Sequence, residues 1–320
     1  MPADLICTSH TPLTNVKGMV SPETEAPVRE SLAALRQRAA EFAPDVVVQF
    51  GSDHNSGLNL GLMPAFLVAI RAKALGDYYT SKGPITVDEA NARALVSHLH
   101  RSGVDVATSY DLTVDHGFTW VLDEIMGGIN EVPVIPIFTN CGGDLRPPFS
   151  RSLALGHAVG EYLREAMPEA RVLILSSGGL SHDPDLPQYL TATPEVQQRL
   201  IEGTDWTEDA LLLRTERLVG AGKAFERGET KLRALNPDWD REILELLRTG
   251  DLEAIGAMED QDVIREGGRG GAEIRNWLAA FAAIRAYGGG HYDAEVVCYR
   301  DIPAWIIGFG IMHARSAAAN

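Results

Sequence analysis

The fold class of this 320-residue chain is decided by the stretch VVVQFGSDH, residues 46–54. Residues 46–50 are mostly β-branched and lack the apolar–polar alternation that is typical of a half-exposed strand. Such a run favours a strand covered on both faces, as in a parallel sheet. His54 follows the run by four residues. The stretch therefore predicts a buried central strand with a polar group at its carboxyl end.

A helix is expected directly before this strand. Ser21 and Pro22 fit an N-cap and a first helical residue. Apolar residues then recur at helical spacing until Pro44 ends the segment, and they are Val28, Leu32, Leu35, Ala39 and Phe42.

The same alternation continues to about residue 182. Strands are expected at residues 5–8, 104–109, 134–139 and 172–176, and helices at 118–126 and 152–166. Strands that alternate with helices indicate βαβ crossovers. The predicted fold class is α/β, with a central sheet, mainly parallel or mixed, flanked by helices.

The chain is expected to form a single domain over residues 1–320, with its α/β core at about 1–182. Charged stretches at 195–200, 208–225 and 240–247 predict a helical region over 183–290, packed on the sheet. Four glycines between residues 267 and 271 predict a flexible connection to a last helix at 272–287. Residues 291–320, with an apolar run at 302–311, are expected to be a C-terminal tail.

Composition excludes several classes of function. With 28 Lys+Arg against 44 Asp+Glu, the net charge is −16, which argues against binding a nucleic-acid backbone or an anionic membrane surface. No stretch approaches the ~18–20 apolar residues of a membrane span, and the first ten residues do not resemble a signal peptide. Three scattered cysteines, Cys7, Cys141 and Cys298, predict reduced thiols in a cytoplasmic protein.

Four histidines follow the expected strands: His10, His54, His116 and His182. Ligands of open α/β sheets bind beyond the carboxyl ends of the strands. A single histidine in a turn is usually a surface residue, but four at equivalent positions favour one shared site. The remaining five histidines lie elsewhere, at positions 98, 100, 157, 291 and 313.

Glu273 lies in the expected first turn of the last helix, at the border of its apolar face. One interpretation is a glutamate that stabilises the helix N-terminus by ~0.3–1 kcal/mol. The other is a metal ligand, because two histidines and one carboxylate form the triad that suits non-haem Fe(II). Asp53 and Asp115, which precede two of the histidines, could equally be helix caps.

Short motifs spread over nearly the whole chain resemble those of the class III extradiol catechol dioxygenases. The matching segments are residues 9–13, 53–54, 63–64, 74–77, 114–118, 177–182, 235–240, 273–274, 277–281, 302–305 and 308–310. Each is short, but their number and order are specific.

This resemblance implies a set of site residues. His10, His54 and Glu273 would hold one Fe(2+) ion, so iron is the expected cofactor. By the same resemblance, His182 would act as the base toward a substrate hydroxyl and His116 as a proton donor. Asp115 is expected to orient or tune His116, its neighbour in sequence.

The implied reaction opens the ring of a catechol with O2. The expected substrate carries a short carboxylated side chain, such as 3-(2,3-dihydroxyphenyl)propionate, and a homo-oligomer is expected. Lys17, Arg269 and Arg275 lie near the motifs as possible partners of the carboxylate. Two alternatives remain open at this point, namely a zinc-dependent hydrolase with the same ligands and a non-enzymatic metal-binding relative.

Overall fold

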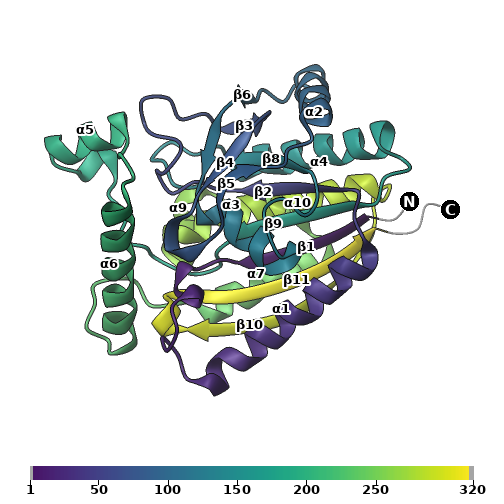
Figure 1. Cartoon of the computed structure of the whole chain (residues 1–320). Helices are drawn as coiled ribbons and strands as arrows, with labels where there is room; N and C mark the ends of the chain where they lie inside the picture. The colour runs from purple at the N-terminus through teal and green to yellow at the C-terminus, as the bar shows by residue number, and fades with distance from the viewer. Residues whose placement is uncertain (1–2, 317–320) are drawn as a thin grey trace.

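The computed structural model describes residues 3–316, and these form an eight-stranded mixed sheet with helices on both faces (Figure 1). The strand order is β10 (Tyr292–Ile302), β11 (Ile307–Ser316), β1 (Ala3–Ser9), β9 (Val172–Gly178), β2 (Val46–Gly51), β8 (Val134–Thr139), β3 (Phe66–Ala69) and β6 (Ala107–Ser109). The four strands β1, β9, β2 and β8 are parallel. Their carboxyl ends therefore share one edge, and the predicted α/β class is confirmed.

Strand β2 lies at the centre, as its sequence predicts. Val46, Val48 and Phe50 point into one apolar core and Val47 into the other, and all four are buried. Because both faces exclude water, apolar residues are favoured on both, and the polar Gln49 is buried with its amide donating to the carbonyl oxygen of Phe118 at 2.7 Å. This burial explains the missing polar alternation.

Helices divide between the two faces of the sheet. One face is covered by α1 (Pro22–Phe42), α3 (His116–Val121) and a small sheet of order β5 (Lys82–Ile85), β4 (Ala72–Leu75) and β7 (Leu112–Val114). The other face is covered by α2 (Glu89–Arg101), α4 (Phe149–Ala166), α7 (Pro237–Thr249), α8 (Leu252–Gly256), α9 (Asp260–Gly267) and α10 (Ile274–Tyr287). Helices α5 (Pro194–Glu202) and α6 (Glu208–Glu226) lie at one side of the molecule, beyond the end of β1 (Figure 1).

Three of the predicted segments differ in the structure, and β3, β4 and β5 were not predicted. The strand expected at 104–109 covers only Ala107–Ser109, and β7 intervenes before His116. Residues 292–316 of the expected tail form β10 and β11, and β11 pairs antiparallel with β1; residues 317–320 lie outside the described part. The glycine-rich connection is packed tightly, with Gly267, Gly270 and Gly271 buried.

Helices α4 and α10 pack closely because α4 presents two glycines to α10. A Cβ atom at Gly156 would lie 2.0 Å from the carbonyl oxygen of Ala279, and one at Gly160 would lie 2.1 Å from that of Ala283. Backbone cannot yield as a flexible side chain does. The spacing of the two helices therefore depends on these glycines.

Gly156→Ala is expected to lower the free energy of unfolding by about 1–3 kcal/mol, because the added methyl group overpacks this contact. Gly220→Ala is the matched control, since a Cβ there meets no heavy atom of the described residues within 4 Å. In the middle of α6 it should be neutral or stabilising by up to ~1 kcal/mol. Urea unfolding of both variants measures the difference; equal stabilities would contradict the packing argument.

Candidate metal centre and acid–base residues

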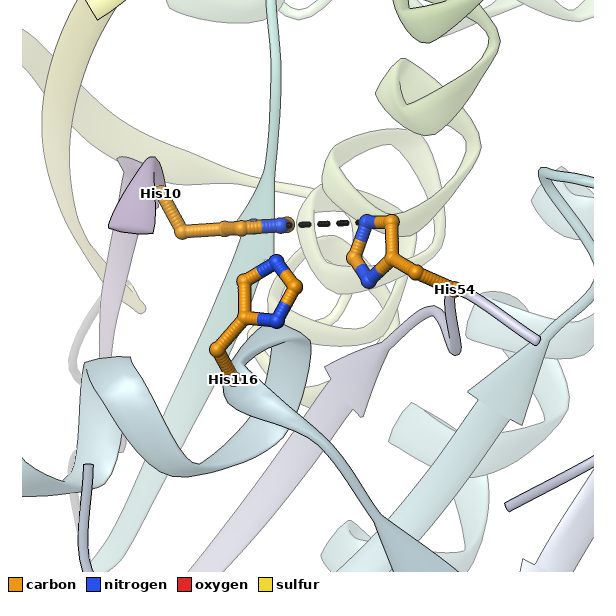
Figure 2. A group of neighbouring side chains, drawn as sticks. All are labelled: His10, His54 and His116. Atoms are coloured by element: carbon orange, nitrogen blue, oxygen red, sulfur yellow. Dashed lines mark hydrogen bonds between the residues drawn. The ribbon is translucent and has the colours of Figure 1, made fainter. Parts of the chain in front are cut away.

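Three of the four predicted histidines follow strands that end at one edge of the sheet. His10 follows β1, His54 follows β2 and His182 follows β9. His116 instead begins α3, after β7 of the small sheet. Figure 2 shows His10, His54 and His116 pointing toward one another. The predicted convergence is therefore present, although one histidine arrives from a different strand.

Glu273 links the histidines into one group. The Nε2 atoms of His10 and His54 are 3.4 Å apart, and His54 Nε2 is 3.0 Å from Glu273 Oε1. On the other side of the carboxylate, His182 Nε2 is 3.8 Å from Glu273 Oε2. Glu273 lies in a 3-10 turn, Gly270–Glu273, directly before α10. All five predicted metal and acid–base side chains thus surround one small volume.

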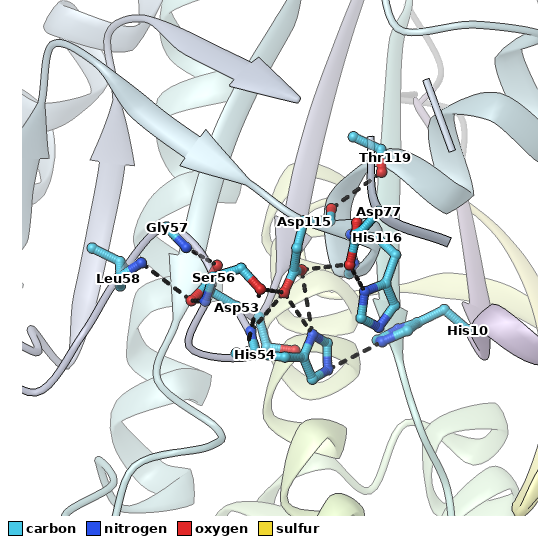
Figure 3. A network of polar contacts seen from close by, with 12 residues as sticks. His10, Asp53, His54, Ser56, Gly57, Leu58, Asp77, Asp115, His116 and Thr119 are labelled. Carbon is cyan, nitrogen blue, oxygen red and sulfur yellow. Dashed lines mark hydrogen bonds and ion pairs between the residues drawn. The ribbon is translucent and has the colours of Figure 1, made fainter. Parts of the chain in front are cut away.

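Asp115 orients His54. Its carboxylate accepts hydrogen bonds from the backbone N–H of His54 at 2.8 Å, from His54 Nδ1 at 3.1 Å and from the Ser56 hydroxyl at 2.9 Å (Figure 3). It also caps α3 by accepting from the N–H of Gly117. Burial disfavours the charged form, but His54 and His116 hold the pKa of Asp115 well below its usual range. An ionised Asp115 keeps the proton of His54 on Nδ1.

Asp77 holds His116. Its two carboxylate oxygens accept from the backbone N–H of His116 at 2.8 Å and from its Nδ1 at 2.7 Å. The sequence interpretation gave this role to Asp115, the neighbour in the chain, but the observed partner comes from the turn after β4. In that turn Gly76, Tyr78 and Tyr79 all have positive φ. Two tyrosines in this conformation are strained, and the turn presents Asp77 to α3.

Backbone groups and glycines fix His182. Its Nδ1 donates to the carbonyl oxygen of Leu180 at 3.0 Å, so the free lone pair of the neutral ring is on Nε2, which faces Glu273. A Cβ atom at Gly179 or at Gly270 would lie within about 2 Å of this ring. The two glycines therefore make room for the histidine between two backbone segments.

The arrangement of lone pairs calls for a cation. Burial lowers the pKa of His54, but the Asp115 and Glu273 carboxylates raise it well above its usual value, so positive charge is favoured at this ring. With its Nδ1 proton held by Asp115, the ring faces two acceptors at Nε2, a carboxylate oxygen and the Nε2 atom of His10. Contacts between such acceptors are repulsive unless a proton or a metal ion lies between them. Burial lowers the pKa of His10 to about 3. Burial raises the pKa of Glu273, but the histidines around this carboxylate hold it below its usual value. Neutral imidazole and ionised carboxylate are the forms that bind metals.

Burial also leaves one oxygen of the site without a partner. Glu273 Oε2 is buried and accepts no hydrogen bond from the described residues, although an unpaired buried carboxylate oxygen is costly. A bound cation would compensate for that charge. The donor set of two imidazoles and a carboxylate therefore fits a divalent metal ion.

Comparison with known proteins identifies the family. A family model for the catalytic LigB subunit of aromatic ring-opening dioxygenase matches residues 4–310. The chain belongs to this family. It is an extradiol aromatic ring-opening dioxygenase, which confirms the resemblance seen in the sequence motifs.

Individual relatives of this LigB-family chain share its full length. Proteins from Photorhabdus laumondii and Paraburkholderia xenovorans, both named 2,3-dihydroxyphenylpropionate/2,3-dihydroxicinnamic acid 1,2-dioxygenase, are each 41% identical to it. The matches cover 98% of both chains in the first case and 99% in the second. A solved structure of an uncharacterized protein from Escherichia coli K12 has the same fold, with a TM-score of 0.51 at 14% identity, and covers 99% of this chain.

Two other groups of side chains in the LigB-family dioxygenase also resemble metal sites. The ligand atoms of His10, His54 and His116 lie within 4.8 Å of one another. However, the rings of His54 and His116 are stacked, with centroids 4.4 Å apart and planes at 18°. Lone pairs lie in the ring planes, so two stacked rings cannot both direct them at one ion. This geometry favours Glu273 over His116 as the third ligand.

The second group consists of Asp77, Asp115 and His116, which are all buried. Arg214 of α6 lies 3.6 Å from Asp77 Oδ2, so the protein already supplies a cation there. Arg214 could not be found from the sequence, because helix periodicity does not show which arginine of a surface helix points inward. Asp77, by contrast, lies within one of the recognised motifs, at 74–77.

The three basic residues suggested as partners of a substrate carboxylate are either exposed or already paired. Lys17 is exposed, and Arg269 is bound to Asp183 and to the carbonyl oxygens of residues 184 and 186. Arg275 is fully buried and donates to Asp260 at 2.5 Å. Both arginines therefore serve the packing around α9 and α10.

No helix among residues 3–316 is long and apolar enough to span a membrane.

Proposed function

We propose that this dioxygenase uses Fe(II) to open the ring of a catechol that carries a short carboxylated side chain, such as 3-(2,3-dihydroxyphenyl)propionate. The observation that carries the proposal is the convergence of two histidines and one ionised glutamate, with two further histidines beside them. Relatives whose names specify 2,3-dihydroxyphenylpropionate match nearly the whole chain at about 40% identity, which supports this substrate class.

The residues that would hold the ion are His10, His54 and Glu273. Two imidazoles and one carboxylate leave coordination positions open, as non-haem Fe(II) oxygenases require. When bound, Fe(II) supplies the redox chemistry that couples a catechol to O2. Asp115 keeps the proton of His54 on Nδ1 and so keeps its Nε2 available as a ligand.

The two remaining histidines differ in the partner of Nδ1, and this difference supports opposite roles. His182 donates from Nδ1 to the carbonyl oxygen of Leu180, which leaves its Nε2 to accept the proton of a substrate hydroxyl. His116 donates from Nδ1 to the Asp77 carboxylate, which fixes the ring in place and suits a proton donor that acts through Nε2. Positioned proton transfer of this kind contributes roughly 10²–10⁴-fold in rate.

Oxygen uptake by protein loaded with Fe(II) under anaerobic conditions tests the proposal. We expect uptake and a yellow ring-fission product, with kcat/KM at least tenfold higher for 3-(2,3-dihydroxyphenyl)propionate than for 3-methylcatechol. A tenfold preference corresponds to ~1.4 kcal/mol from the carboxylated side chain. Absence of uptake with every catechol would refute the proposal, and equal activity after loading with Zn(II) would refute the assignment to iron.

The proposal includes a homo-oligomer in the cytoplasm. All three cysteines are free, and Cys7 and Cys141 are buried, as is common in a reducing compartment. Closed symmetric assemblies are common among soluble enzymes. Light scattering after gel filtration measures the assembly, and a mass of one chain, 34.7 kDa, would contradict it.

A further inference from the structure

Helix α6 brings a largely buried arginine to the carboxylates behind the histidines. Arg214 donates from Nη1 to the Ser56 hydroxyl at 2.9 Å and from Nη2 to the backbone carbonyl of His54 at 3.2 Å. Its guanidinium also lies 3.6 Å from Asp77 Oδ2, with 17% of the side chain exposed. One side chain therefore contacts the supports of both His54 and His116.

The surroundings hold this guanidinium in a fixed place. It lies over the rings of Tyr78 and Trp206, at 5.2 Å and 4.6 Å from their centroids. Cation–π contacts of this kind favour arginine, whose planar group also donates in several directions. The aromatic contacts and the two hydrogen bonds together leave the side chain little freedom.

Ser56 connects Arg214 to the candidate ligand His54. The Ser56 hydroxyl accepts from Arg214 and donates to Asp115 Oδ2, and Asp115 in turn accepts from His54 Nδ1. A second connection runs from Arg214 to Asp77, which holds His116. Outer hydrogen-bond partners of this kind orient metal ligands and are worth 10–100-fold in metal affinity or activity.

The segment around Arg214 also binds the loop that carries His54. Trp206 Nε1 donates to the carbonyl oxygen of Ser56 at 3.2 Å. The N–H groups of Leu60 and Gly61 donate to the carbonyl oxygens of residues 200 and 201. Helices α5 and α6, which lie at one side of the molecule (Figure 1), thus meet the active site at this loop, and α6 also packs against the turns Pro12–Asn15 and Pro303–Trp305.

We propose that Arg214 is a positioning residue, which couples the seating of α6 to the orientation of His54 and His116. The guanidinium fixes the His54 loop through Ser56 and the His54 carbonyl, and it provides the positive charge beside buried Asp77 and Asp115. The inference rests on the proposed function, because it assigns His54 to the metal and His116 to proton transfer.

Arg214→Gln and Arg214→Lys test this role, with Arg217→Gln as the control. Arg217 lies on the same helix and is exposed. For Arg214→Gln we expect Fe(II) affinity, measured anaerobically by competition with a chromogenic chelator, to fall roughly 10–100-fold. We expect kcat at saturating Fe(II) to fall by a similar factor, with a smaller change in KM. Lysine keeps the charge but has one nitrogen in place of the two that contact Ser56 and the His54 carbonyl, so it should restore part of the loss.

Ser56→Ala provides a second measurement that leaves α6 intact. We expect Ser56→Ala to lower the iron affinity less than Arg214→Gln does. Because both substitutions break the same connection to Asp115, the double variant should lose no more affinity than Arg214→Gln alone. If Arg214→Gln does not fold, the iron affinity of Ser56→Ala still tests the connection. A purely structural role would lower the melting temperature but leave the iron affinity and kcat of folded protein unchanged, and that result would overturn the inference. Inactive wild-type protein would instead refute the proposed function.

Discussion

Glu273→Gln protein is expected to lose both its iron and its ring-opening activity, whereas His116→Ala protein should keep its iron and lose only activity. Glutamine is nearly isosteric with glutamate but neutral, so it removes the charge that would balance the ion. Its amide also places a donor or a weaker acceptor where Glu273 Oε1 faces His54 Nε2 at 3.0 Å. The loss of affinity should exceed the ~10–100-fold that removal of an outer hydrogen-bond partner causes.

Metal content after anaerobic loading and desalting separates the two candidate triads. Iron retained by Glu273→Gln but lost from His116→Ala would establish His116 as the third ligand, against the argument from its stacked ring. His182→Ala is a useful control, because its Nε2 is 3.8 Å from Glu273 and its predicted role is proton transfer. That variant should bind iron nearly as the wild type does and turn over substrate far more slowly.

The core of the fold and the place of most of the histidines could be predicted because their signals are local, whereas the role of each residue is implied only by the family resemblance. The apolar run at 46–50 shows burial on both faces directly, and a histidine shortly after a strand reaches the ligand-binding edge of the sheet. His10, His54 and His182 follow this rule. Glu273 lies at the border of an apolar helical face, which is also visible in the sequence.

The contacts between distant segments could not be predicted in the same way. Asp77 reaches His116 only through a turn with three residues at positive φ, and two of them are tyrosines, which seldom adopt it. Arg214 lies in a helix whose periodicity is that of any surface helix. Pairing of β11 with β1 joins segments some 300 residues apart, as in the pair Cys7 and Met312. A local pattern contains no information about which distant partner completes it.

Asp77→Asn is expected to lower kcat by roughly 10²–10⁴-fold while leaving the iron content unchanged. His116 directs two donors at this side chain, its backbone N–H and its ring Nδ1–H, and each meets one carboxylate oxygen. Asparagine has a single acceptor oxygen, so one of the two donors must face an NH2 group. The ring then either loses its fixed orientation or shifts its proton to Nε2. A comparable Asp→Asn change beside the histidine of a serine-protease triad lowers kcat by about 10⁴.

The double variant Asp77→Asn/His116→Ala decides whether Asp77 acts through His116. If it does, the double variant should be no slower than His116→Ala alone, because the group that Asp77 orients is already absent. Additive losses would show that Asp77 acts elsewhere, for example as the counter-charge of Arg214 at 3.6 Å. The iron affinity of Asp77→Asn gives a second test of where Asp77 acts. The connection from Arg214 to His54 runs through Ser56 and Asp115 and does not require Asp77, so iron affinity should not change. Loss of iron from Asp77→Asn would therefore mean that the support of His116 by Asp77 and the support of His54 by Asp115 are coupled through Arg214.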